Sequence, residues 1–148
     1  MRDPDQHSED VLFARLQHWP LFLHRHCIDS HQELRPRWLY LGYHTRIPRS
    51  INNDGTTHFT INVIYGIFYL LYVEIEPTER GKGYGDQLYT LLEQVASDLG
   101  CREFRQTPSG TTRGGETRRD YLLRRHWLPI TGSVEVFKPI VASDEGRS

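Results

Sequence analysis

Hydrophobic residues in the middle of the chain follow two patterns that predict neighbouring strands. Phe59, Ile61 and Val63 alternate with polar residues, which is typical of a strand with one buried face. Residues 67–75 are almost continuously apolar, so we expect a central strand that is covered on both faces. Residues 37–47 are rich in aromatic and aliphatic side chains, and they predict a further strand.

The next pattern has the spacing of a helix. Apolar residues recur on one helical face from Leu88 to Leu99, and Gly100 follows at a position suited to a C-terminal cap. We therefore expect a helix over about 83–99. Residues 101–106 predict a strand after it, parallel to the preceding strand because a helical crossover lies between them.

Weaker patterns flank this centre. Apolar residues at near-helical spacing predict one or two short helices within residues 11–23, where a proline interrupts them. We also expect a helix over about 116–125 and a last strand near 134–138.

Length and composition define one domain and few partners. A chain of 148 residues has room for one core, so we expect a single domain over 10–140, with a polar, disordered N-terminus at 1–9 and a flexible tail at 141–148. The net charge of −1 gives no overall attraction to nucleic acid or to a membrane surface. Two cysteines and the lack of an apolar run of membrane-spanning length lead us to expect a soluble, cytoplasmic protein.

The glycine-rich stretch of residues 80–85 lies between the apolar strand and the helix. Arg80 and Lys82 fall where the helix begins, and the helix dipole disfavours each positive charge there by about 0.3–1 kcal/mol. A bound phosphate group would compensate them, and the glycines would let backbone N–H groups approach it. The alternative is that both cations are solvated turn residues. A P-loop is excluded because Gly83 follows the lysine, and a dinucleotide fingerprint is excluded because Asp86 replaces its third glycine.

The stretch matches the Arg/Gln-x-x-Gly-x-Gly/Ala pyrophosphate loop of the GNAT N-acetyltransferases, with Arg80 first and then Gly83 and Gly85. The segment VEIEPTERGKGYGDQLYTLLEQVASDLGCREF resembles that family from its fourth strand through its third helix into its fifth strand. The resemblance is good over 70–104, extends loosely to residue 140, and is weak before Phe59. It implies an α/β (α+β) GNAT fold, with a mixed central β-sheet flanked by helices and splayed parallel central strands.

The resemblance also implies a cofactor, acetyl-CoA. Its pantetheine arm would lie between the splayed strands and pair with the backbone of residues 74–76, while its pyrophosphate would meet the glycine loop. The cofactor-binding residues implied in this way are Ile75, Glu76, Arg80, Gly81, Lys82, Gly83, Tyr84 and Gly85.

The activity that the resemblance implies is transfer of an acetyl group to a primary amine by direct attack on the thioester. Glu74 and Glu76 are the candidate general bases, although either could be a solvated residue at the strand end, and a bulge would decide which one faces the cleft. Tyr121 is the candidate general acid, one position away from the family's usual tyrosine, and core packing is the alternative. His58 is a reserve candidate for the base.

The sequence disfavours two other kinds of ligand, a metal ion and a nucleic acid. His24, Cys27 and His31 could share a helical face, but no second ligand pair follows them, so we expect no metal site. Arginines between residues 102 and 125 could meet the 3′-phosphate of the cofactor, whereas a nucleic-acid surface is disfavoured because few aromatic residues accompany them.

The acceptor, a small molecule or a protein amino group, is not readable from the chain. The aromatic residues Trp38, Tyr40 and Tyr43 could line its pocket or pack in the core. A homodimer stays open. The alternative function is a non-catalytic acyl-CoA-binding module, or one that binds nucleic acid or protein, on the same fold.

Overall fold

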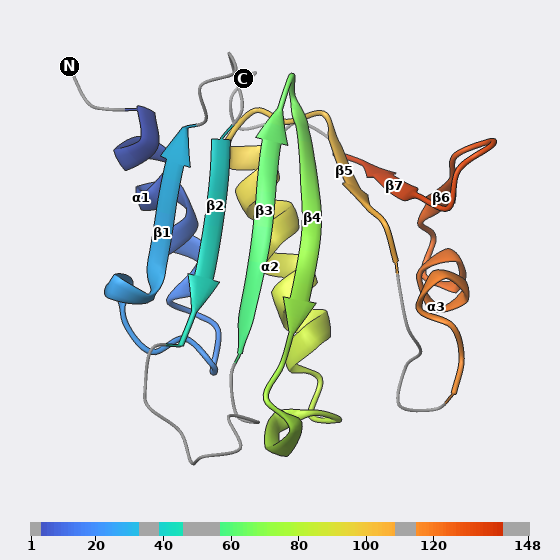
Figure 1. Cartoon of the computed structure of the whole chain (residues 1–148), viewed down its shortest axis with the longest axis horizontal. Helices are drawn as coiled ribbons and strands as arrows, with labels where there is room; N and C mark the ends of the chain where they lie inside the picture. Colours follow the sequence, from blue (N-terminus) through green and yellow to red (C-terminus); the bar gives the residue numbers. More distant parts are fainter. Residues whose placement is uncertain (1–3, 33–38, 46–56, 109–114, 141–148) are drawn as a thin grey trace, which may run out of the picture.

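The computed structural model describes residues 4–32, 39–45, 57–108 and 115–140. Seven strands form one sheet in the order β1-β2-β3-β4-β5-β7-β6 (Figure 1). Within the described residues only β4 and β5 pair in parallel, and every other neighbouring pair is antiparallel. The predicted mixed sheet flanked by helices is therefore confirmed. The strands are β1 (Ile28–Gln32), β2 (Leu39–His44), β3 (His58–Ile64), β4 (Ile67–Glu74), β5 (Glu103–Gln106), β6 (Leu128–Pro129) and β7 (Val136–Pro139).

Two helices, α1 (Pro4–Leu16) and α2 (Tyr84–Asp98), lie side by side on one face of the sheet (Figure 1). Their buried leucines pack on the apolar side chains of the central strands, and this contact forms the core. The fully buried members with no exposed surface include Leu12, Leu92, Leu41, Ile61, Phe68 and Phe104. Among the described elements, no helix covers the opposite face of β1 to β4. No described helix is long and apolar enough to cross a membrane.

The N-terminal region differs from the sequence prediction. Helix α1 already begins at Pro4, so residues 4–9, which were expected to be disordered, are helical, and proline suits a first helical turn because its missing N–H is not needed there. Of the one or two short helices predicted within residues 11–23, only α1 forms, since residues 17–24 are turns and irregular chain. The 3-10 turn η1 (Arg25–Cys27) and β1 follow, and neither was predicted. Residues 1–3 and the tail 141–148 lie outside the described residues.

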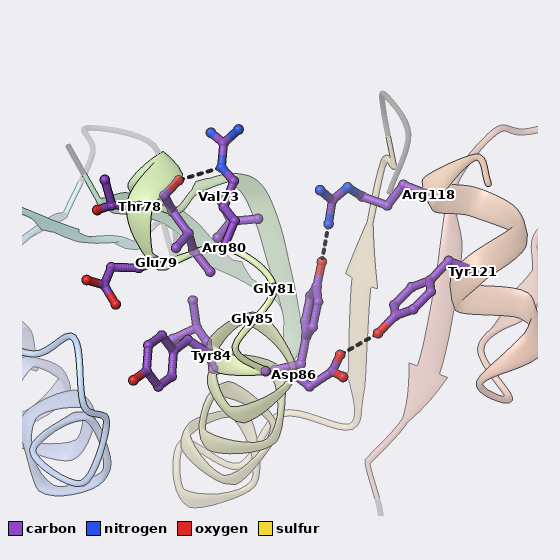
Figure 2. Close-up of a pocket in the computed structure, with 14 residues that line it drawn as sticks. Val73, Thr78, Glu79, Arg80, Gly81, Tyr84, Gly85, Asp86, Arg118 and Tyr121 are labelled. Atoms are coloured by element: carbon purple, nitrogen blue, oxygen red, sulfur yellow. Dashed lines mark hydrogen bonds between the residues drawn. The ribbon is translucent and has the colours of Figure 1, made fainter. Parts of the chain in front are cut away.

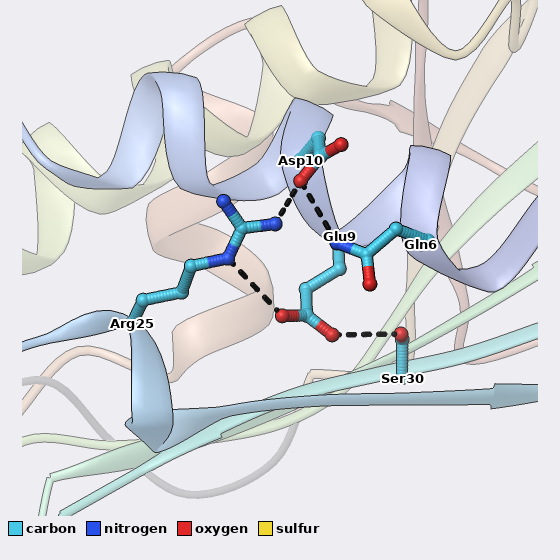
Figure 3. Close-up of polar contacts among 5 residues, drawn as sticks. All are labelled: Gln6, Glu9, Asp10, Arg25 and Ser30. Carbon is cyan, nitrogen blue, oxygen red and sulfur yellow. Dashed lines mark hydrogen bonds and ion pairs between the residues drawn. The ribbon is translucent and has the colours of Figure 1, made fainter. Parts of the chain in front are cut away.

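A polar cluster fastens α1 to η1 and β1 (Figure 3). Arg25 donates from Nε to Glu9 Oε1 at 3.3 Å and pairs through Nη2 with Asp10. Ser30 Oγ donates to Glu9 Oε2 at 3.4 Å, and Gln6 Nε2 donates to Asp10 Oδ1 at 3.0 Å. All of these groups are partly exposed or exposed, so the cluster fixes the position of the chain more than it adds stability.

Strand β4 carries a bulge that the sequence could not locate. Thr60 of β3 pairs with Tyr72, whereas the next residue, Ile61, pairs with Leu70, so Leu71 is the extra residue. Leu71 and Tyr72 are 49% and 50% exposed. The expectation that residues 67–75 are covered on both faces was therefore wrong for their second half, because no described helix covers that face.

The connection after β4 follows the sequence prediction closely. Helix α2 spans Tyr84–Asp98, and Gly100 takes a left-handed φ of +79° beyond its last turn. The Gly100 N–H donates to Ser97 O at 3.0 Å and the Cys101 N–H donates to Ala96 O at 2.9 Å, the hydrogen bonds of a Schellman cap. The cap turns the chain directly into β5, which is parallel to β4 as predicted.

The last elements form a smaller unit beside β5. Helix α3 (Arg118–Arg124) is capped by Thr117, whose side chain accepts from the Asp120 N–H at 3.1 Å. It lies within the predicted range 116–125. Strand β7 confirms the predicted strand near 134–138, while the short strand β6 was not predicted.

Strands β4 and β5 separate beyond their paired residues, and we call the opening between them the fork. Residues Ile67 to Leu70 of β4 pair with Glu103 to Gln106 of β5, and among the described residues no pair joins the two strands beyond this point. Strand β4 continues to Glu74 while β5 ends at Gln106, and the two diverge in Figure 1. The predicted splay of the parallel central strands is confirmed.

We predict that Leu92→Ala lowers the free energy of unfolding by about 2–5 kcal/mol, because it leaves a cavity between α2 and the sheet. Leu92 has no exposed surface, whereas Leu23 is 44% exposed, so Leu23→Ala serves as the control and should cost well under half as much. Urea unfolding of both variants measures the difference. Equal losses would contradict the described core.

Candidate functional site

A pocket of about 860 Å³ opens where β4 ends, between the loop of residues 80–85, the start of α2, and α3 (Figure 2). Val73 of β4 and Ile75, just after β4, line it on one side, and Arg118 and Tyr121 line it from α3. Of the eight predicted cofactor-binding residues, Glu76 and Lys82 do not line the pocket. The other six do: Ile75, Arg80, Gly81, Gly83, Tyr84 and Gly85.

The loop has the backbone that its glycines allow. Gly81 and Gly83 take φ angles of +81° and +83°, in the left-handed region that other residues rarely adopt. Gly83 is also the N-cap of α2, and no side chain caps the first amides of that helix. The partial positive charge of the helix N-terminus is therefore directed to the pocket side of the loop, an arrangement suited to an anion.

The two cations of the loop have partners within the chain. Arg80 Nε donates to the backbone carbonyl of Ile75 at 2.7 Å, and its Nη2 lies 3.8 Å from Glu74 Oε1. Lys82 Nζ pairs with Glu79 Oε2 at 3.0 Å, and this hydrogen bond raises the pKa of the lysine. The compensating negative charge that the sequence led us to expect is thus partly supplied by two carboxylates of the chain.

The bulge at Leu71 decides the direction of the residues after it. Val73 and Ile75 point into the pocket, whereas Tyr72 and Glu74 lie together on the opposite face, where the Tyr72 hydroxyl donates to Glu74 Oε2 at 2.6 Å. Hydrogen bonding to Glu74 raises the pKa of Tyr72. His58, the reserve candidate, pairs in register with Glu74 and stacks on the Tyr72 ring, with centroids 4.9 Å apart.

Glu76 lies just beyond the end of β4. Its backbone N–H donates to Thr57 Oγ1 at 2.9 Å. This N–H, one of the groups expected to pair with a pantetheine arm, already has a partner in the chain. Neither Glu74 nor Glu76 lines the pocket.

Tyr121 projects from α3 toward the first turn of α2 (Figure 2). Its hydroxyl donates to Asp86 Oδ1 at 2.5 Å, while Arg125 Nη2 lies 3.1 Å from the other carboxylate oxygen. The Arg125 guanidinium also lies 4.6 Å from the centre of the Tyr121 ring. These contacts bridge the two helices across the pocket.

The ionisation of Tyr121 follows from these contacts. Burial, followed by the hydrogen bond and the charge of Asp86, raises the pKa of Tyr121 from 10.0 to about 12, against a smaller opposing effect of Arg125. Sequence reasoning had missed Asp86 as a site residue. Two features of the sequence point to Asp86. It stands where a dinucleotide-binding fingerprint would have its third glycine, and it is the one acidic residue in the first turn of α2.

One further basic side chain, that of Arg118, lines the pocket. Arg118 Nη1 donates to the Tyr89 hydroxyl at 3.2 Å, and both residues line the pocket. Arg118 belongs to the arginine-rich region that the sequence associated with a cofactor phosphate. Arg124, by contrast, pairs with Glu116 at 3.0 Å and does not line the pocket, and Arg113 lies outside the described residues.

The remaining candidates lie away from the pocket. His24, Cys27 and His31 do not share a helix, because η1 ends at Cys27 and β1 follows. Within the part of the chain that the structure describes, no group of three or more His, Cys, Asp or Glu side chains could hold a metal ion.

Of the aromatic run, Tyr43 is fully buried in the core, where its hydroxyl donates to Leu21 O at 2.8 Å. Tyr40 stacks on His31 with ring centroids 5.3 Å apart. Trp38 lies outside the described residues.

Comparison with known proteins identifies the family that the loop resembles. Residues 51–112 match the model of the acetyltransferase (GNAT) family, so the predicted resemblance is confirmed over this segment. No curated protein sequence matches the chain.

The chain also matches solved structures at low similarity. A variant of the AtaT toxin bound to the C-terminus of the antitoxin AtaR and acetyl-CoA is 14% identical with a TM-score of 0.41, and the match covers 70% of this chain and 60% of the toxin. A provisionally assigned acyl-CoA N-acyltransferase from Klebsiella pneumoniae is 20% identical with a TM-score of 0.45, over 94% and 92% of the two chains. The ribosomal-protein-S18-alanine N-acetyltransferase from Escherichia coli is 11% identical with a TM-score of 0.46, over 91% and 89%. Similarity at this level does not identify an acceptor or a partner for this chain.

Burial is the largest cause of the raised pKa of Tyr121 and remains in Asp86→Asn. We predict that this variant lowers the pKa of Tyr121 only part of the way from about 12 toward 10, because it removes the negative charge that disfavours the phenolate. A raised pKa in the folded state contributes stability that is present below pH 10 and is lost as the pH rises from about 10 to about 12. The variant should lose less stability over this interval. A ¹³C NMR titration of labelled tyrosine, with Tyr121→Phe to assign the signal, measures the pKa.

Asp98→Asn is the matched control, because Asp98 pairs with Arg15 at the far end of α2. It should leave the pKa of Tyr121 unchanged. A Tyr121 pKa that is equally unchanged in Asp86→Asn would show that the Asp86 contact does not control the ionisation of Tyr121.

Proposed function

We propose, from the match of residues 51–112 to the acetyltransferase (GNAT) family, that the protein is an acetyl-CoA-dependent N-acetyltransferase acting on a primary amine. One observation carries the proposal. The glycine loop, the start of α2 and the β4 edge that has no strand partner among the described residues meet at a single pocket, and each could bind a different part of acetyl-CoA. The acceptor is the amino group of a small molecule or of a protein.

The glycine loop holds the pyrophosphate of the cofactor in this proposal. The first amides of α2 point to the pocket side and supply backbone donors for an anion. Arg80 also lines the pocket, and its guanidinium, which now contacts Ile75 O and lies near Glu74, would turn to the bound anion. Arg118 adds a second positive charge from α3. Because Arg80 also holds the carbonyl of Ile75, the same side chain links the anion site to the end of β4.

The fork between β4 and β5 receives the pantetheine arm. Beyond Leu70, the β4 edge that faces β5 has no strand partner among the described residues, and amide groups of the arm can take that place. Bound in this way, acetyl-CoA supplies a thioester carbonyl that an amine can attack. The pocket volume of about 860 Å³ lies within the usual range for a site of this kind.

Glu74 and Glu76 are the proposed bases that free the lone pair of the acceptor amine. Glu74 is preferred because it lies on the open face of the sheet beside the fork, where an acceptor can approach. Its carboxylate is oriented by the hydrogen bond from Tyr72. His58 stacks on the same tyrosine and stays the reserve candidate.

Tyr121 is the proposed acid, and its contacts set a condition on that role. Its hydroxyl donates to Asp86, and its pKa of about 12 keeps it protonated at neutral pH. To protonate a departing thiolate, the hydroxyl must exchange the Asp86 contact for the sulfur. A homodimer and a cytoplasmic location remain part of the proposal.

We expect Arg80→Ala to weaken the binding of CoA by about 10- to 100-fold, the equivalent of losing one charge-assisted hydrogen bond of roughly 1.5–3 kcal/mol. Isothermal titration calorimetry measures the dissociation constant. Arg15→Ala is the matched control, since Arg15 forms an exposed ion pair with Asp98 away from the pocket. It should leave CoA binding unchanged. If wild-type protein gives no heat with acetyl-CoA or CoA at millimolar concentration, the proposed function is wrong.

We expect Glu74→Gln to lower the rate of thiol release from acetyl-CoA in the presence of an amine by about 10²- to 10⁴-fold, the usual contribution of a general base. The effect should shrink as the pH rises, because free amine then becomes abundant. Glu76→Gln is the comparison and should have a smaller effect, since Glu76 lies beyond β4. The reverse order would assign the base to Glu76.

The same assay separates the two function hypotheses. A panel of polyamines, amino acids, aminoglycosides and lysine-containing or N-terminal peptides covers the main classes of amine. Turnover of one class identifies the acceptor chemistry. Binding of acetyl-CoA without turnover on any of them would favour the non-catalytic acyl-CoA-binding module.

A further inference from the structure

The side-chain amide nitrogen of Gln106, Nε2, is buried without a hydrogen-bond partner. The residue is 3% exposed, and its Nε2 is one of three buried side-chain atoms without a partner in the described part of the chain. A buried donor in this state is costly, because it has lost water and gained nothing in return. Such groups are rare in folded proteins, and each one calls for a physical explanation.

Gln106 lies at the vertex of the fork. It is the last residue of β5 and pairs with Leu70 of β4 on one side and Val136 of β7 on the other. Immediately after Leu70 comes the bulge residue Leu71, and from there β4 continues without β5. The unpartnered donor is thus next to the point where the parallel pairing stops.

The same side chain lies on the face of the sheet that bears the pocket. Phe104, two residues earlier and therefore on the same face, contacts the Trp127 ring with centroids 5.0 Å apart. Trp127 in turn contacts Tyr89, which lines the pocket, at 6.4 Å. Val73, another lining residue, follows Leu70 by three positions, roughly 10 Å along an extended strand.

The other two unpartnered atoms differ in their location. Asn62, whose Oδ1 has no partner, lies in β3 and pairs in register with Tyr40 of β2 and Tyr69 of β4, inside the antiparallel part of the sheet. Glu135 Oε2 belongs to the turn that precedes β7. Only Gln106 combines an unpartnered donor with a position at the closed end of the fork.

We infer that Gln106 binds a carbonyl oxygen of the ligand arm that enters the fork between β4 and β5. This inference rests on the proposed function, because the arm it would contact is the pantetheine arm of acetyl-CoA, whose amide carbonyls are also present in CoA. The Nε2 group donates to one of these oxygens and fixes how deeply the arm enters. Gln106 is a binding residue in this view, with no part in proton transfer.

The inference predicts opposite effects on stability and on binding. Gln106→Met keeps the length of the side chain but removes the donor, so the thermal midpoint of the free protein should stay the same or rise. Its affinity for CoA should fall about tenfold, the usual cost of one lost neutral hydrogen bond. Its affinity for ADP, which has the diphosphate but no pantetheine arm, should not change. Differential scanning fluorimetry and calorimetry measure the three quantities.

Asn62→Leu is the matched control, because it removes another buried amide with one unpartnered atom, Oδ1, at a site away from the fork. It should leave both ligand affinities unchanged. A second measurement uses the unaltered protein: the ¹⁵N-labelled side-chain amide of Gln106, assigned by its loss in Gln106→Met, should shift on addition of CoA and stay in place with ADP.

Failure of the proposed function and failure of this inference would give different results. If wild-type protein binds neither CoA nor ADP, the proposed function is wrong. If it binds CoA, and Gln106→Met binds CoA within twofold of wild type, the inference is overturned while the cofactor site stands, and a buried water is then the partner of Nε2. Equal weakening of CoA and ADP, or an amide signal that does not respond to CoA, would also overturn the inference.

Discussion

The interruption of the parallel pairing between β4 and β5 is the constraint on which the rest of the structure depends. Pairing stops at Leu70 and Gln106, while β4 continues to Glu74. The chain satisfies part of the exposed strand end with side chains, since Arg80 holds the carbonyl of Ile75 and Thr57 accepts from the N–H of Glu76. Such contacts lower the free-energy cost of backbone groups that have no hydrogen bonds to a neighbouring strand. The β4 edge that faces β5 is left available to a ligand.

The sheet also separates two kinds of chemistry. On the helix-bearing side, the glycine loop, Asp86 and Tyr121 surround the pocket, and the backbone amides at the start of α2 together with Arg118 suit an anionic ligand. On the open side, Glu74 lies with Tyr72 and His58. In the proposed reaction, cofactor and acceptor approach from different sides of the sheet and meet at the fork. The bulge at Leu71 therefore decides which side chains after it face the cofactor and which face the acceptor.

Local signals in the sequence were sufficient for the central unit. The helix after the glycine loop, its cap at Gly100 and the parallel strand β5 follow from apolar spacing and from a crossover rule that needs no distant contact. Three features could not be predicted, because each depends on pairing across the chain. The bulge at Leu71 depends on β3, the polar strand β1 depends on β2, and the contact between Asp86 and Tyr121 joins residues 35 positions apart.

The Schellman cap has a chemical consequence through the residue that completes it. Cys101 is 5% exposed, and burial raises the pKa of its thiol to about 11. At neutral pH only about one thiol in ten thousand is then ionised, and the thiolate is the reactive species. A protein that handled thioesters and released free CoA would be exposed to self-acylation and to mixed disulfides. The buried position of Cys101 protects it against both side reactions.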